Sequence, residues 1–171
     1  GQIYPLHPSS QFRKAGSTDL IELMPVPKGH PLFIPKWVLE TVVSAIVSHE
    51  CIHLSGPTGS AKTSLLEALY RVPENFLTLC AALGLPGKPL KLYPVEMAIF
   101  ETPGEVLQRR ALRDGTTYDE ASPLVRALRA IAEDQEECHP LVWLREIGRV
   151  HSPVVQGGLL NLMSPGDIIL P

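Results

Sequence analysis

The stretch HECIHLSGPTGSAKTSLL, from His49 to Leu66, contains two motifs that need different secondary structures. Its first five residues fit H-E-x-x-H, in which two histidines on one helical face bind zinc. Its later residues, from Gly56 to Thr63, fit a glycine-rich loop that ends in Lys-Thr and holds phosphate. The zinc motif requires a helix through His53, whereas the phosphate loop requires a strand there. The flanking sequence decides between them.

The phosphate-loop pattern G-x-x-x-x-G-K-[ST] is met at Gly56, Lys62 and Thr63 and broken at Ala61, where glycine is expected. Alanine fits there if the residue has an ordinary helical φ, because it then adds only a methyl group. Backbone N–H groups at a helix N-terminus would surround the β-phosphate. Lys62 would reach the β- and γ-phosphates, and the Thr63 hydroxyl would bind Mg²⁺. The predicted nucleotide-binding residues are Gly56, Pro57, Thr58, Gly59, Ser60, Ala61, Lys62, Thr63 and Ser64. The alternative is a Gly-Pro turn followed by a helix with a surface lysine.

The residues on either side of the loop favour the phosphate interpretation. Cys51 to Leu54 is a short apolar run that ends in Ser-Gly, which predicts a buried strand leading into the loop. A helix over residues 62–71 follows and ends before Pro73. A strand before the loop and a helix after it are what phosphate binding requires.

The zinc interpretation meets two obstacles. Gly56 and Pro57 would end the helix three residues after His53. Glu74 has a suitable spacing for a third ligand but lies beyond Pro73. A zinc peptidase built on His49-Glu50-x-x-His53 therefore stays a remote alternative.

Outward from this stretch, helices and strands alternate, which predicts an α/β domain with a mainly parallel sheet. Residues 1–33 read as an extended lead-in, and residues 35–50 as a helix opened by proline. The further expected elements are a strand over 90–100, a helix starting at 103, a hairpin at Asp114-Gly115, a helix over 122–137, a strand over 140–147, a helix over about 153–163 and a strand starting at 167. We therefore expect a lead-in over residues 1–33 and a partial P-loop core over residues 34–171.

Composition and charge narrow the possible partners of the 171-residue chain. Its formal net charge of −3 gives no general attraction to nucleic acid or to anionic membranes. No apolar run is long enough to span a membrane, and no signal peptide opens the chain. Three scattered cysteines fit a reducing compartment, so we expect a cytoplasmic protein. The basic cluster Arg109, Arg110 and Arg113 is more typical of a solvated face than of a nucleic-acid contact.

Hydrolysis of ATP needs acids at the end of a second buried strand, one for the Mg²⁺ shell and one to polarise the attacking water. The candidate strand, LVWLRE, ends at Arg145 and Glu146. Glu146 is the acid that this strand offers, and Lys62 in the loop is the second candidate catalytic residue. The alternative for Glu146 is an ordinary surface acid at a strand end.

The stretch LVWLREIGRVHSPVVQGGLLNLMSPGDIILP, residues 141–171, resembles AAA+ ATPases of the MoxR type, in which this strand ends Asp-Glu-Ile-Asn-Arg. Ile147, Arg149, the run Leu159-Leu160-Asn161 and Gly166 fall in place. In the same register Glu146 matches the catalytic glutamate, so the resemblance implies that Glu146 activates the attacking water. The GPTG opening of the loop and a hairpin inside a helix also fit this branch, which carries an insert in its second helix. The resemblance covers residues 34–171. It implies a three-layer P-loop NTPase sandwich, cut off before the sensor strand and the helical lid.

The resemblance implies a function and also shows two departures. It implies a ring-forming homo-oligomer that binds ATP and Mg²⁺, hydrolyses ATP and remodels a protein client. Arg145 stands where the family has its Mg²⁺-associated Asp, and Gly148 stands where it has Asn. Arg145 would weaken Mg²⁺ binding by charge repulsion or neutralise phosphate directly. The alternative function is a nucleotide-binding structural or regulatory subunit that has lost hydrolysis. The hairpin around Arg113 to Thr117 would face a substrate or a neighbour, or be a plain solvated turn.

Overall fold

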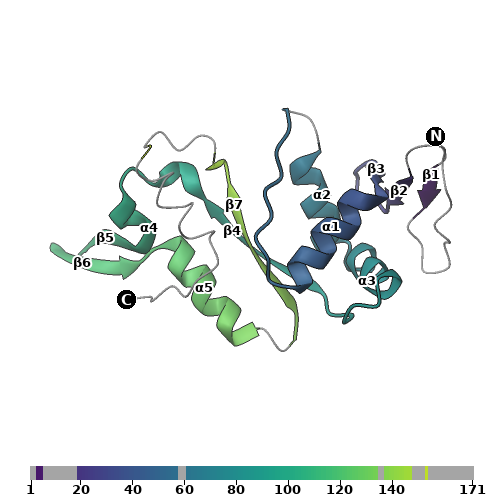
Figure 1. Cartoon of the computed structure of the whole chain (residues 1–171). Coiled ribbons are helices and arrows are strands. Elements are labelled where there is room, and N and C mark those ends of the chain that lie inside the picture. The colour runs from purple at the N-terminus through teal and green to yellow at the C-terminus, as the bar shows by residue number, and fades with distance from the viewer. Residues whose placement is uncertain (1–2, 6–18, 58–60, 135–136, 148–152, 154–171) are drawn as a thin grey trace. The chain divides into compact units, whose positions relative to one another are not determined.

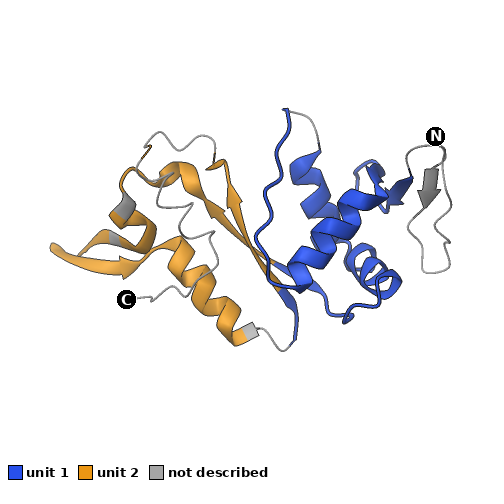
Figure 2. Ribbon diagram, in the orientation of Figure 1, with its two compact units in different colours: residues 1–91, 137–139 blue, residues 92–136, 140–171 orange. Residues whose placement is uncertain are grey.

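The computed structural model describes residues 3–5, 19–57, 61–134, 137–147 and 153 (Figure 1). The chain divides into two compact units (Figure 2). Unit 1 comprises residues 1–91 and 137–139, and unit 2 comprises residues 92–136 and 140–171. Each unit is described by itself below. The boundary expected between residues 33 and 34 falls inside a strand of unit 1.

Unit 1 contains a three-stranded sheet formed by β1 (Ile3–Pro5), β2 (Leu20–Leu23) and β3 (Leu32–Pro35). β1 pairs with β2 in parallel, and β2 pairs with β3 antiparallel. Ile21 and Leu23 alternate with half-buried neighbours on β2 and are themselves fully buried, as expected for a strand with one face on a core. The predicted lead-in thus supplies part of the hydrophobic core.

Three helices complete unit 1: α1 (Lys36–Val47), α2 (Lys62–Arg71) and α3 (Pro73–Ala82). The predictions of α1 and α2 are confirmed, and the bounds of α2 are those predicted. The sequence pattern does not predict α3, because in that pattern Pro73 marks only the end of the preceding helix. Proline is also favoured at the first position of a helix, and Pro73 begins α3 in this way. The largest buried side chains of the three helices are Leu39, Val42, Val43, Ile46, Leu69, Phe76 and Leu79.

Unit 2 is built around a hairpin inserted between two helices. Its elements are β4 (Leu90–Glu96, which begins in unit 1), η1 (Met97–Ile99), α4 (Pro103–Leu107), β5 (Gln108–Arg113), β6 (Thr116–Ala121), α5 (Pro123–Asp134) and β7 (His139–Arg145, whose first residue belongs to unit 1). The predicted hairpin is confirmed: Asp114 and Gly115 have φ of 52° and 75°, the positive values that a two-residue hairpin turn needs. The predicted start of α5 is also confirmed, since the Ser122 hydroxyl accepts a hydrogen bond from the Val125 N–H at 3.1 Å.

β4 and β7 form a two-stranded sheet. The N–H of His139 donates to the carbonyl of Pro89 at 2.8 Å, next to the first residue of both strands. Both strands therefore run from this bond in the same direction, and the sheet is parallel.

The described chain is a mixed α/β protein with a small parallel sheet. The prediction of a buried strand over Cys51–Leu54 is wrong, because these residues form no strand. Cys51 and His53 are exposed, and only Ile52 and Leu54 are half-buried, so one side of the segment meets solvent. The predicted helix over about 153–163 and the strand from 167 lie outside the described residues, apart from residue 153. Among the described residues, no helix combines the length and apolarity needed to cross a bilayer.

Candidate phosphate-binding site

The end of α1 shows whether the two histidines of the H-E-x-x-H motif lie on one helix. The N–H of Glu50 donates to the carbonyl of Ala45 at 2.8 Å, and the N–H of His49 donates to that of Ile46 at 3.2 Å. With His49 in the left-handed region, at φ of 57°, these two bonds make a Schellman motif that terminates the helix. His49 and His53 therefore do not share a helical face. Over the residues that the structure describes, no group of three or more His, Cys, Asp or Glu side chains could hold a metal ion.

The backbone of the predicted loop has unusual torsions at two described positions. Gly56 has φ of 156°, a value that glycine adopts more readily than other residues. Ala61 has φ of 60° and ψ of 17°, which is the left-handed helical region. The condition under which alanine is expected to fit the phosphate-loop pattern, an ordinary helical φ, is therefore not met. The conformation costs a residue with a Cβ about 1–2 kcal/mol, so the surrounding structure must hold it in place.

Lys62, the first residue of α2, folds back onto the start of the loop. Its Nζ donates to the carbonyl of Gly56 at 2.7 Å and to the carbonyl of Pro57 at 2.8 Å. An ammonium group has three donors, and two of them are directed at the entrance of the loop. These two bonds join the Lys62 side chain to the backbone six and five residues earlier in the chain.

The N-terminus of α2 has the features that anion binding requires. Its N-cap, Ala61, makes no side-chain cap hydrogen bond, and the first turn contains no acidic residue. The first N–H groups of an α-helix have no partner within the helix and carry the positive end of its dipole. Thr63 and Ser64 are exposed in this turn, whereas Leu65 and Leu69 are buried and anchor the helix in the core. The helix is therefore anchored in the core on one side and exposed to solvent at Thr63 and Ser64.

The second predicted part of the site follows β7. The strand ends at Arg145, and Glu146 comes directly after it with φ of 54° and an exposed side chain. The guanidinium carbon of Arg145 lies 5.1 Å from the centroid of the Trp143 ring. Glu146 belongs to unit 2 and the phosphate loop to unit 1. The prediction that Glu146 and Arg145 come close to Thr63 stays a prediction.

A shallow hollow of about 330 Å³ lies at the base of the hairpin in unit 2. Its charged groups are engaged with one another and with the backbone. Glu105 accepts hydrogen bonds from the N–H groups of Thr102 and Glu101, and Arg110 lies 3.8 Å from Asp119 on the opposite strand. Arg113 is likewise 3.9 Å from Asp114. The two ion pairs are solvent-exposed, so Arg110 and Arg113, the two members of the basic cluster whose side chains are described, lie on a solvated face as expected.

Sequence reasoning missed Glu96, the last residue of β4. Its Oε1 is buried and has no hydrogen-bond partner, the one such side-chain atom found among the described residues. Its signal in the sequence was weak, since a glutamate at a predicted strand end is usually solvated.

Comparisons with models of protein families, with curated proteins and with solved structures find no match to this chain. The functional assignment therefore depends on the residues and geometry given above.

Proposed function

We propose that residues 56–64 bind the phosphate groups of ATP. The observation that carries the proposal is the position of Lys62, whose Nζ donates to the carbonyls of Gly56 and Pro57 while its backbone begins α2. The charge of a lysine and the N-terminus of a helix both attract phosphate, and here they belong to one residue.

The torsions of the loop support the same assignment. A left-handed residue followed by a helical one directs successive N–H groups toward a common point and forms an anion-binding nest. Ala61 and Lys62 have this sequence of conformations. Positive φ at a residue other than glycine costs energy, and such residues occur at ligand sites as well as at helix ends and hairpin turns such as those at His49 and Asp114. The Cys51–Leu54 segment lends no support, since it is not the strand that was expected to carry the loop.

For the protein as a whole we propose an AAA+ ATPase of MoxR-like, chaperone-like character. The hairpin between α4 and α5 supports this, because the resemblance implies an insert at that place. Thr63 would help to hold Mg²⁺, which neutralises charge on the phosphates when it is bound. Glu146 would polarise the attacking water. The remaining proposals are a P-loop NTPase fold, assembly into a ring, a protein client and a cytoplasmic location.

The second candidate is a nucleotide-binding subunit that no longer hydrolyses ATP. Arg145 favours it, because a guanidinium occupies the place where the resemblance implies the magnesium acid. Both candidates require the same phosphate loop, and they differ in turnover.

Calorimetric titration with ATP tests the proposal. Lys62→Ala should weaken ATP binding at least about tenfold, since a charged hydrogen-bond donor to phosphate contributes about 1.5–3 kcal/mol. Lys36→Ala is the matched control: it removes the same charge from a half-buried α1 side chain whose pair with Glu40 spans 3.5 Å. Equal ATP affinity in the wild type and in Lys62→Ala would overturn the assignment of the loop.

A further inference from the structure

The pairing of β4 and β7 can be read residue by residue. In a parallel pair, the N–H of one residue donates to the carbonyl that precedes its partner, so the bond from His139 to Pro89 places His139 opposite Leu90. Both strands are seven residues long, and each starts at this pair. Counting six residues along each strand places Arg145 opposite Glu96.

The hydrophobic core of unit 2 is consistent with this register. Tyr93 and Val95 of β4 pack in the same cluster as Val142 and Leu144 of β7. In the register above these are the opposite pairs 93–142 and 95–144, which lie on one face of the sheet. Because successive side chains alternate between faces, Glu96, Arg145 and Trp143 share the other face.

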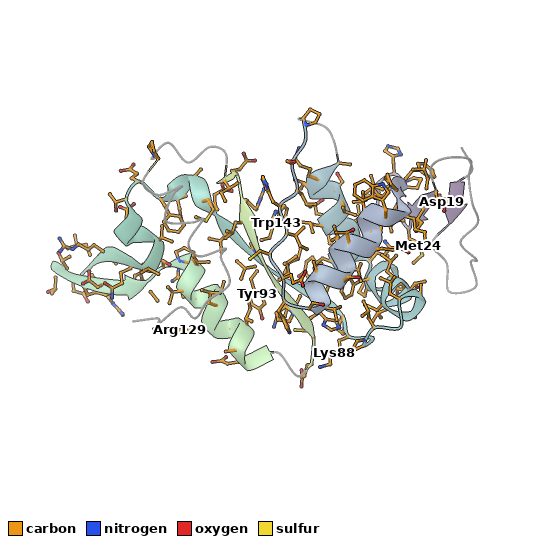
Figure 3. The ribbon with its side chains drawn as sticks, viewed as in Figure 1. Asp19, Met24, Lys88, Tyr93, Arg129 and Trp143 are labelled. Atoms are coloured by element: carbon orange, nitrogen blue, oxygen red, sulfur yellow. The ribbon has the colours of Figure 1, made fainter. Side chains whose placement is uncertain are left out.

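On that face a buried carboxylate oxygen of Glu96 lacks a hydrogen-bond donor, while the guanidinium of Arg145 lies over the ring of Trp143. Glu96 Oε1 is buried and has no hydrogen-bond partner. Arg145, about 4.8 Å away across the strands by backbone spacing, places its guanidinium over the ring of Trp143, two residues earlier on β7 (Figure 3 labels Trp143). A buried acceptor without a donor is destabilising, and a guanidinium is the strongest donor to a carboxylate.

We propose that Glu96 is a positioning residue for Arg145, whose guanidinium alternates between the Trp143 ring and the Glu96 carboxylate. When the guanidinium lies over the Trp143 ring, its positive charge points back along β7, away from Glu146. When the guanidinium binds Glu96, its charge lies at the end of the sheet and is neutralised by this carboxylate on the neighbouring strand, β4. In both positions the positive charge is held on the face of the sheet. The inference concerns these three side chains and does not depend on nucleotide binding.

Tryptophan fluorescence tests this, because the chain contains only Trp37 and Trp143. Trp37 is 67% exposed, so Trp37→Phe leaves Trp143 as the single reporter without disturbing a core. In this background, Arg145→Ala uncovers the ring and should raise the acrylamide quenching constant of Trp143. Glu96→Gln removes the competing charged acceptor, so the guanidinium stays on the ring and the quenching constant should fall.

The combination of both substitutions gives the decisive result. Glu96→Gln should leave quenching unchanged when Arg145 is already alanine, because the effect passes through the arginine. A control, Glu101→Gln, changes an exposed acid of the same unit and should have no effect in either background. Arg145→Lys keeps the charge and loses the planar stacking, so it should raise quenching as Arg145→Ala does. An effect of Glu96→Gln that persists without Arg145, or no effect of Glu96→Gln with Arg145 present, would overturn the proposal.

Discussion

The side chain of Asn75, on α3, makes hydrogen bonds with both backbone groups of Met24, which follows β2. Its Oδ1 accepts from the Met24 N–H at 3.0 Å, and its Nδ2 donates to the Met24 carbonyl at 3.0 Å. Nδ2 also donates to the carbonyl of Ala68 in α2 at 3.0 Å. Asn75 is fully buried, so one amide joins the sheet of unit 1 to two of its helices.

Removal of this amide should destabilise the protein strongly. Asn75→Ala leaves up to three backbone groups without a partner, and we expect a loss of about 3 kcal/mol in the free energy of unfolding. Urea denaturation followed by circular dichroism measures the loss. Thr78→Ala, on the same helix and half-buried, is the control and should cost less than about 1 kcal/mol. A loss in Asn75→Ala no larger than in the control would contradict the prediction.

Replacing Ala61 with glycine should stabilise the protein. Because its φ is positive, Ala61→Gly relieves local strain and should raise the free energy of unfolding by about 0.5–1 kcal/mol, while a β-branched valine should lower it. Ala132→Gly, at an exposed helical position of α5, should instead lower it by about 0.5–1 kcal/mol. Thermal denaturation of the variants separates the two cases. Destabilisation by Ala61→Gly would show that Ala61 does not have this backbone conformation in solution.

The proposed role of Thr63 can be separated from that of Lys62. Thr63 is exposed, so Thr63→Ala should leave the fold intact. We expect this variant to lose the increase in ATP affinity that Mg²⁺ produces while keeping its affinity for ATP in the presence of a chelator. Thr63→Ser, which keeps the hydroxyl, should retain the Mg²⁺ effect. A Thr63→Ala protein that still responds to Mg²⁺ would remove Thr63 from the metal site.

Arg145→Asp tests whether hydrolysis has been lost or retained. The substitution restores the acid that the resemblance implies, so Mg²⁺-dependent turnover by the proposed ATPase should rise. Glu146→Gln on that background should abolish the gain, because the water loses its polarising carboxylate. The introduced carboxylate would stand opposite Glu96, and two like charges there should also lower stability. Unchanged turnover would mean that Arg145 does not occupy the metal position, and rapid turnover of the unmodified protein would exclude the subunit without hydrolysis.

The buried Cys80 thiol should make stability depend on alkaline pH. Burial raises the pKa of the Cys80 thiol above its ordinary value of 9.0, because the interior disfavours the thiolate. The unfolded state then binds fewer protons above about pH 9 than the folded state, so the free energy of unfolding falls as pH rises beyond that value. Equilibrium unfolding between about pH 8 and 10 measures the fall, which should be smaller in Cys80→Ala. Alkylation followed by mass spectrometry should label exposed Cys51 well before Cys80.

Several elements could be predicted from the sequence because the interactions that determine them are local. The helix Lys62–Arg71 lies between a glycine-rich sequence and Pro73. α5 starts at Pro123, where the Ser122 hydroxyl accepts a hydrogen bond from the N–H three residues further along the chain. Asp114-Gly115 forms a two-residue turn because these residues tolerate positive φ. In each case the deciding contacts lie within a few positions of one another.

Only the tertiary structure decided the features that depend on distant partners. The apolar run Cys51–Leu54 resembles a strand, but a strand also needs neighbouring chains to accept its hydrogen bonds, and among the described residues none is assigned to it. The sequence around Asn75 suggests a surface residue, and only the fold shows that its side chain bonds to Met24, 51 positions away. The apposition of Glu96 and Arg145 follows from the register of β4 and β7, which a single bond between Pro89 and His139 reveals. Local propensity reaches over one turn or one hairpin, whereas burial and strand pairing depend on where the rest of the chain goes.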